Sequence, residues 1–210
     1  MHLATLLTLA DSRLPTGGHV HSGGVEEAIA SHLVHDISTL EAFLRRRIAT
    51  SGLVNGSIAA AVCSGALDPA VADRETDART PAPAARQASR AQGRGLLRLA
   101  KQAWPEHDWA ELGARPHLPV MSGIVGKVTG ATAAETALVV VYTSMTGSAT
   151  AAQRLLALDP TAVAAVTFRL ATLCDETAET AATGLSNLSD PLLDVLAQRH
   201  VQRERPLFAS

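Results

Sequence analysis

Apolar residues recur every three to four positions over most of this chain, and alternation between two faces is nowhere sustained. This spacing is typical of helices that bury one side. The segments with the clearest pattern are residues 25–34, 38–48, 57–63, 83–103, 133–157, 160–185 and 191–204. We therefore predict an all-α fold, with residues 1–210 forming a single-domain bundle of roughly eight to ten helices.

Capping signals predict where several helices begin. Asp followed by Pro supplies an N-cap and a proline at the first helical position, and this pair begins at Asp68, Asp159 and Asp190. A Ser or Thr with Glu three positions later is a capping box, which the sequence offers at Ser38 and Thr132. These starts support the helical prediction.

Three further segments carry structural expectations. Residues 52–56 include two glycines and are expected to loosen the chain between two helices. The three arginines at 45–47 are expected on a solvated helix face. Residues 104–119, with three prolines, are expected to form the longest loop and to divide the core.

Composition narrows the class of protein. Hydrophobic residues make up 47%, aromatic residues 3%, and the formal net charge is −2. The chain is therefore neither disordered nor basic enough to suggest a nucleic-acid partner. Cys63 and Cys174 form no C-x-x-C pair and indicate buried thiols in a reducing compartment. The apolar runs at 3–10 and 137–152 resemble neither a signal peptide nor a membrane span, so we expect a cytoplasmic protein without a membrane partner.

A glycine-rich loop near the start of the chain separates two apolar segments. Pro15 blocks helix continuation, and glycines stand on both sides of a His-Val-His triplet. Such a loop suits a backbone that takes positive φ or approaches another group closely, although, taken by itself, the loop is better interpreted as a tight connection between helices. The loop residues concerned are Gly17, Gly18, His19, His21, Gly23 and Gly24.

Five of the eight histidines lie in the first 35 residues. His19 and His21 flank one residue of the glycine loop and are weak candidates for transient contact with a metal ion. His32 and His35 are one helical turn apart and are predicted to share a face. Because no Cys or acidic residue completes a ligand set at a characteristic spacing, surface or packing roles are the alternative.

Catalytic motifs are absent from the sequence. The segment around Gly126 and Lys127 lacks the upstream glycine and the Ser/Thr of a phosphate loop, with Met121 and Val128 in those places. No Gly-x-Ser-x-Gly or His-Glu-x-x-His occurs. We therefore predict a binding protein with no catalytic residue and no cofactor rather than an enzyme.

Several short motifs occur in a fixed order along the whole chain. They are Leu14 to Glu26 in the glycine loop, Arg74-Glu75-Thr76, Gly93 to Leu99, Gln153-Arg154, and Ser189 to Phe208 at the end. In this order they resemble the family of urease accessory proteins called UreF. The resemblance implies an all-helical, dimer-forming protein without enzymatic activity. It also implies a complex with UreD (UreH in some organisms) and the GTPase UreG that delivers nickel to apo-urease, possibly with an effect on GTP hydrolysis.

The resemblance also implies where partners bind. The glycine loop and the end of a tail near 199–210 are expected to contact UreD, and the polar residues around Glu26 and Arg74 are expected to dock UreG. The implied partner-binding residues are Gly17, Gly18, His19, His21, Glu26, Arg74, Glu75, Gln153, Arg154, Arg199, His200, Arg205, Leu207 and Phe208.

The chain departs from the family pattern at four of these places. His19 and His21 replace aromatic residues, Val201 replaces a glutamate, and Pro206 replaces an arginine for which Arg205 is a substitute. Two alternatives to the resemblance stay open: a small helical metal-binding enzyme that uses the N-terminal histidines, and a helical scaffold for another complex.

Overall fold

The structure, a computed structural model, describes residues 3–109, 112–187, 190–203 and 207–208, without the side chain of His19. All regular elements in these ranges are helical, which confirms the all-α prediction. The α-helices are α1 (Leu3–Leu9), α2 (Val25–Ala30), α3 (Ile37–Arg47), α4 (Leu53–Ser64), α5 (Pro69–Ala78), α6 (Pro83–Ala103), α7 (Leu118–Val128), α8 (Ala133–Leu156), α9 (Pro160–Ala182) and α10 (Pro191–His200). A 3-10 turn covers Gly18–Val20 and a π turn covers Ile48–Gly52.

The three predicted Asp-Pro starts are confirmed. Each aspartate accepts hydrogen bonds from two backbone N–H groups in the first turn of α5, α9 or α10. The capping box at Thr132 is also confirmed, but the one at Ser38 is wrong. Asp36 caps α3 instead: its Oδ1 accepts from the Thr39 N–H at 2.8 Å, and Thr39 Oγ1 accepts from the Asp36 N–H at 3.0 Å.

The predicted interruption at 52–56 is wrong, because the chain stays helical from α3 through the π turn into α4. Gly56 explains why glycines occur here without a break. A Cβ at this position would lie 3.3 Å from atoms of both Ala181 and Val141. The glycine therefore lets α4 approach α8 and α9 closely rather than ending a helix.

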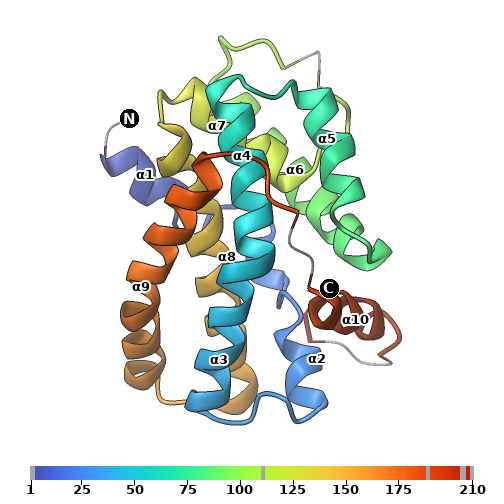
Figure 1. The fold of residues 1–210 in the computed structure, drawn as a ribbon, viewed down its shortest axis with the longest axis vertical. Coiled ribbons are helices and arrows are strands. Elements are labelled where there is room, and N and C mark those ends of the chain that lie inside the picture. The colour runs from blue at the N-terminus through green and yellow to red at the C-terminus, as the bar shows by residue number, and fades with distance from the viewer. Residues whose placement is uncertain (1–2, 110–111, 188–189, 204–206, 209–210) are drawn as a thin grey trace.

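Helices α4, α8 and α9 pack together, with α9 along one edge of the molecule, and α3 extends α4 toward one end (Figure 1). The largest apolar cluster lies around α3, α8 and α9 and includes Leu44, Met145 and Leu170. A second cluster joins α4, α6 and α7 and includes Ile58, Leu96 and Met121. The last helix, α10, packs on α2 and α6 at the side of the bundle (Figure 1).

The three arginines at 45–47 do not all lie free on a solvated face as predicted: Arg45 and Arg46 are exposed, whereas Arg47 is half-buried. Arg46 forms a bidentate ion pair with Asp190, with N–O distances of 2.6 and 2.7 Å. Arg47 donates to the backbone carbonyls of Gly23 and Ser144, and burial lowers its pKa to about 10. The solvated-face prediction therefore holds for Arg45 and Arg46 and is wrong for Arg47.

Several helices are shorter than the pattern suggests. The first predicted helix ends at Ala30, because the chain turns at His32, whose φ is 54°. His32 and His35 therefore do not share a helix face, and that prediction is wrong.

Cys63 and Cys174 are buried free thiols, as expected. No described helix has both the length and the apolar character needed to cross a membrane.

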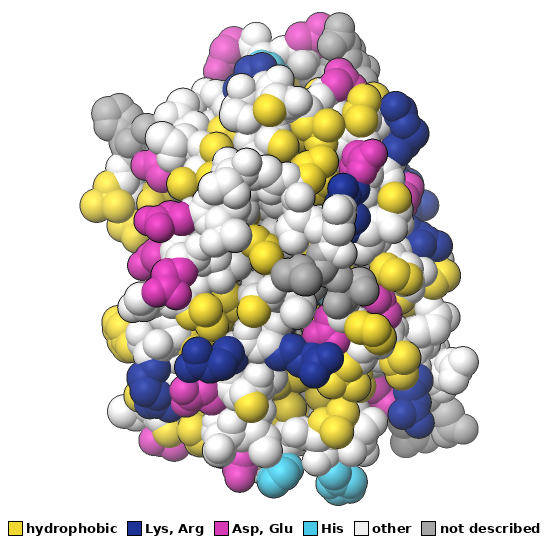
Figure 2. All heavy atoms as spheres, viewed as in Figure 1, with side chains coloured by type: hydrophobic (Ala, Val, Ile, Leu, Met, Phe, Trp, Pro, Cys, Tyr) yellow, Lys and Arg dark blue, Asp and Glu magenta, His cyan; other side chains and the backbone are white. Residues whose placement is uncertain are grey.

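The face shown in Figure 2 carries charged side chains of both signs with apolar side chains between them. Neither sign forms a continuous patch on this face. The surface seen here is therefore mixed in charge and polarity.

Candidate functional site

The end of the chain folds back onto α2, where it forms hydrogen bonds with a buried glutamate. Glu26 lies in the first turn of α2 and its residue is only 3% exposed. Its Oε2 accepts from His200 Nε2 at 2.7 Å and from the Phe208 N–H at 3.0 Å. Its Oε1 accepts from the Leu207 N–H at 2.8 Å. One carboxylate thus holds the end of α10 and the tail beyond it.

These hydrogen bonds determine the charge state of Glu26. Burial opposes ionisation, but the donors from His200, Leu207 and Phe208 outweigh it, so the pKa of Glu26 lies below its ordinary value. The carboxylate is therefore ionised at neutral pH. Next to it, Arg203 donates to Glu27 at 3.1 Å, which adds a second link between α2 and the segment after α10.

Helix α10 is held at both ends. At its start Asp190 caps the helix and pairs with Arg46 of α3, and at its end His200 reaches Glu26 of α2. Burial would raise the pKa of Asp190, but the Arg46 guanidinium beside it lowers that pKa below its ordinary range. These two contacts fix the direction of α10 and so the place where the tail emerges.

Leu207 and Phe208 point in different directions from this anchor. Phe208 is half-buried and packs against the largest apolar cluster. The backbone N–H of Leu207 donates to Glu26, but the residue is 79% exposed. The anchor therefore presents an apolar side chain to solvent in a fixed position, where a partner can cover it.

The glycine loop lies beside this anchor and has the backbone geometry that the sequence suggested. Gly17, Gly23 and Gly24 all have positive φ, between 63° and 89°. A Cβ on Gly23 would lie 2.8 Å from the Arg47 guanidinium and from Ser148 Oγ. The Gly23 carbonyl accepts from Arg47 at 2.8 Å. The loop is therefore held tightly against α3 and α8 just before α2 begins.

A cavity of about 540 Å³ lies under the glycine loop, among α3, α6, α8 and α10. His21 and Gly18 of the loop line it, together with Arg154 near the end of α8 and Phe208 of the tail. Residues of both the glycine loop and the anchored tail therefore line one cavity.

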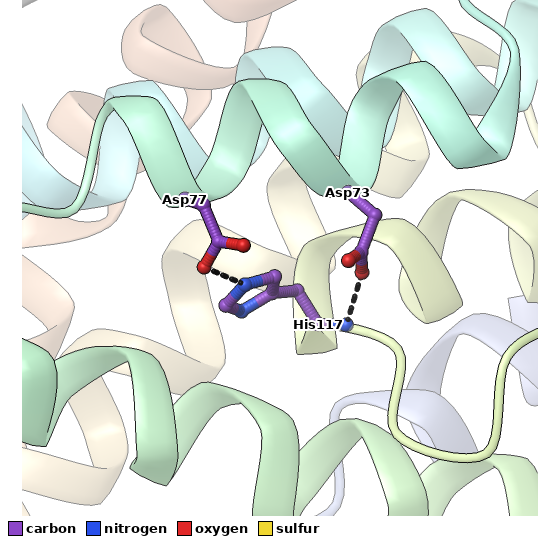
Figure 3. A group of neighbouring side chains, drawn as sticks. All are labelled: Asp73, Asp77 and His117. Carbon is purple, nitrogen blue, oxygen red and sulfur yellow. Dashed lines mark hydrogen bonds and ion pairs between the residues drawn. The ribbon is translucent and has the colours of Figure 1, made fainter.

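A second polar cluster lies on another part of the molecule. Asp73 and Asp77 project from α5 toward His117, which precedes α7 (Figure 3). Asp77 Oδ1 lies 2.9 Å from His117 Nε2, and Asp73 Oδ1 accepts from the His117 N–H at 3.0 Å. Within the described ranges, these three residues are the one group of His, Cys, Asp or Glu with ligand atoms close enough to hold a metal ion, all within 4.8 Å of one another.

The charges of this second cluster are set by burial and by Arg90. Burial lowers the pKa of His117, which keeps the imidazole neutral. Burial would raise the pKa of Asp77, but hydrogen bonds from His117 and Arg90 lower it below its ordinary value. The sequence analysis missed this cluster. The spacing of four between the aspartates was visible, but nothing in the sequence indicated that a histidine forty positions later would join them.

Comparison with known proteins identifies the family to which this chain belongs. The family model described as UreF matches residues 34–171, which is more than half of the chain. A urease accessory protein UreF of Mycobacterium sp. (strain JLS) is 71% identical over 208 residues, covering 99% of both chains. The protein of the same name from Mycolicibacterium vanbaalenii is 69% identical over 211 residues, and the one from Mycobacterium tuberculosis (strain H37Ra) is 64% identical over 208, each again covering 99% of both chains.

The chain belongs to the UreF family. This confirms the family named from the ordered motifs of the sequence. With the family established, the residues predicted to bind partners divide into those that the structure brings together and those that it does not.

The glycine loop, Glu26, His200, Leu207 and Phe208 converge at the α2–α10 anchor. Gln153 and Arg154 lie near the end of α8, where Arg154 is exposed and lines the cavity. Arg199 is exposed on α10. Arg205 and the His19 side chain lie outside the described residues, as does Pro206.

Arg74 and Glu75 lie on α5, which packs mainly on α4 and α7 and not at the anchor. Arg74 is exposed, whereas Glu75 pairs with Arg79 one turn further along the helix. The predicted UreF-family site is therefore two separate surfaces, one at the tail anchor and one on α5.

Proposed function

We propose that this chain acts in urease maturation as a non-enzymatic accessory protein. It joins UreD (or UreH) and the GTPase UreG in a complex that delivers nickel to apo-urease. Membership of the UreF family supports this role, as do full-length relatives whose name is urease accessory protein UreF. The complex forms in the cytoplasm, and the chain contributes surfaces rather than catalytic groups.

The observation that carries the proposal is the geometry of Leu207. Its backbone is fixed by Glu26, while its side chain is 79% exposed. An apolar side chain that is already ordered costs little further entropy when a partner covers it. We therefore assign the tail, with the neighbouring glycine loop, as the surface that binds UreD.

Glu26 takes a different role in this proposal from the one first expected. It is buried beneath the tail and its carboxylate is engaged by three donors of its own chain. Glu26 therefore serves the complex by positioning the tail. Arg74, which is exposed on α5, stays the proposed contact for UreG, with Glu75 and Arg79 ordering that surface through their ion pair.

The proposed homodimer needs an apolar surface of its own. Phe168 of α9 is 81% exposed and lies among polar and small side chains on the outer face of that helix. A two-fold interface places the same patch of both copies in contact, and aromatic residues are enriched at such contacts. We propose that α9 contributes to the dimer through Phe168.

The test is co-expression of the tagged chain with the UreD, UreG and apo-urease of its own organism. Recovery of UreD, with UreG following when nucleotide is present, supports the maturation complex. If none of the three is recovered while the chain is folded and abundant, the proposed function is wrong.

Light scattering of the purified chain and of the variant F168A tests the dimer. The dimer of the variant is expected to dissociate at a higher protein concentration than the dimer of the wild type.

A further inference from the structure

We propose that Asp73, Asp77 and His117 form a binding site for one divalent transition-metal ion, in which Arg90 holds the cation position while no metal is bound. The site lies between α5 and the start of α7, away from the tail anchor (Figure 3). The inference rests on these residues alone and not on the proposed function.

The ligand set suits such an ion. Asp73 and Asp77 are one turn apart and face the same way, and each offers a carboxylate oxygen. His117 adds an imidazole nitrogen, and the three ligand atoms lie within 4.8 Å of one another. Mixed nitrogen and oxygen ligands favour ions such as Ni²⁺, Zn²⁺ and Co²⁺ over Mg²⁺ and Ca²⁺, which prefer oxygen alone.

Arg90 marks where a positive charge is stabilised. Its Nη2 lies 2.9 Å from Asp73 Oδ2 and 2.7 Å from Asp77 Oδ2, so a cationic nitrogen sits between the two carboxylates. An ion bound to both carboxylates needs the same position. The Arg90 side chain is 25% exposed, and its Nη1 also donates to the Arg115 carbonyl at 2.7 Å, so a metal ion that replaces its Nη2 must displace the guanidinium toward solvent against this hydrogen bond.

The ring of His117 is oriented for this role. Ser89 Oγ accepts from the Leu118 N–H at 3.2 Å, so its own hydroxyl can donate to His117 Nδ1, which lies 3.0 Å away. In that state Nε2–H donates to Asp77. When a metal ion binds Nε2, the proton moves to Nδ1, which then donates to Ser89 Oγ. A hydrogen-bonded second nitrogen is the usual arrangement of metal-binding histidines.

A second arginine provides a matched control. Arg86 Nε lies 3.9 Å from Asp77 Oδ1, so it contributes positive charge to the cluster. Its Nη1, however, donates to the carbonyls of Thr80 and Pro81, and it does not lie between the carboxylates. Removing Arg86 changes the local charge as removing Arg90 does, but it does not vacate the metal position.

The experiment is calorimetric titration of the untagged full-length chain with NiCl₂, and separately with MgCl₂, in a buffer that does not bind metal. We expect one Ni²⁺ per chain and no saturable binding of Mg²⁺. The variants D73N and D77N are each expected to weaken Ni²⁺ binding by about tenfold or more. R90Q is expected to strengthen it by about tenfold, and R86Q by much less. The variant H19A/H21A is expected to bind as the wild type does.

Thermal unfolding followed by circular dichroism shows which variants are folded. If one of D73N and D77N does not fold, the other still tests whether the carboxylates bind the ion. The inference is wrong if the wild type and R90Q both bind no Ni²⁺, if both aspartate variants bind as tightly as the wild type, or if R90Q and R86Q raise affinity equally. Loss of metal binding in H19A/H21A would instead place the ion at the glycine loop and would also overturn it. None of these outcomes bears on UreD recovery, so this inference and the proposed function fail separately.

Discussion

The Nε2 atom of His200 lies 2.7 Å from Oε2 of Glu26 and so joins the end of α10 to α2 across 174 positions of sequence. Both residues are nearly inaccessible, at 2% and 3% exposure. The same carboxylate also accepts from the Leu207 and Phe208 backbone, so Glu26 ties both α10 and the tail to α2.

The variant E26Q should release the tail and destabilise the chain. A glutamine keeps one acceptor oxygen but faces the tail donors with its NH₂ group, so at least one charged hydrogen bond is lost. We expect a loss of about 2 kcal/mol in the free energy of unfolding, measured in urea, and faster proteolysis after residue 200. E27Q is the control, because Glu27 binds the Arg203 side chain but no backbone group of the tail residues that the structure describes, and its effect should be smaller.

The contribution of Glu26 should depend on pH with a defined sign. Its pKa in the folded chain is lower than the ordinary value of 4.5. The stability that it supplies is therefore complete above about pH 4.5 and is lost as pH falls through the folded-state pKa. Urea unfolding of the wild type and of E26Q is measured from pH 7 to pH 3.5. The difference between their free energies of unfolding should stay constant and shrink only at the acid end. A difference that shrinks between pH 7 and pH 6 would contradict this assignment.

The ion pair between Arg46 and Asp190 should couple α3 to α10. A double-mutant cycle with R46Q and D190N is expected to give a coupling free energy of about 1 kcal/mol, reduced by the partial exposure of Arg46. The i,i+4 pair of Glu41 and Arg45, at 3.8 Å, is the control and should give about 0.3 kcal/mol. Equal coupling in the two pairs would show that Asp190 does not anchor α10.

Two glycines should respond to alanine in opposite directions. At Gly23 the φ is 63° and an added Cβ would meet the Arg47 guanidinium, so G23A is expected to lower stability by about 1–3 kcal/mol. At Gly147, within α8, an added Cβ meets no atom within 4 Å. G147A should therefore raise stability by about 0.5–1 kcal/mol, since alanine favours the helix. Melting temperatures of the two variants test both signs.

Local rules predicted the all-α class and the starts of several helices. Asp68, Asp159 and Asp190 each cap a helix because the side chain and the following proline act within one turn. The same reasoning failed at residues 52–56, because the glycines serve contacts with α8 and α9 that only the folded chain reveals.

The candidate site was predicted only in part, because it too depends on contacts between segments that are distant in sequence. Glu26, His200 and Phe208 were identified through family motifs, but their convergence on one carboxylate is a contact between distant segments. The burial of Arg47 and the meeting of His117 with Asp77 also depend on packing between helices that are far apart in sequence. Periodicity and caps carry no information about such contacts.

The central claim is that the anchored tail binds UreD. The most direct measurement is the ratio of UreD to this chain after co-purification, compared between the full chain, L207A and a chain that ends at residue 206. We expect L207A to lower the ratio and the truncated chain to lose UreD almost completely, with both variants still folded by circular dichroism. If both variants retain UreD as the full chain does, the tail is not the UreD-binding surface.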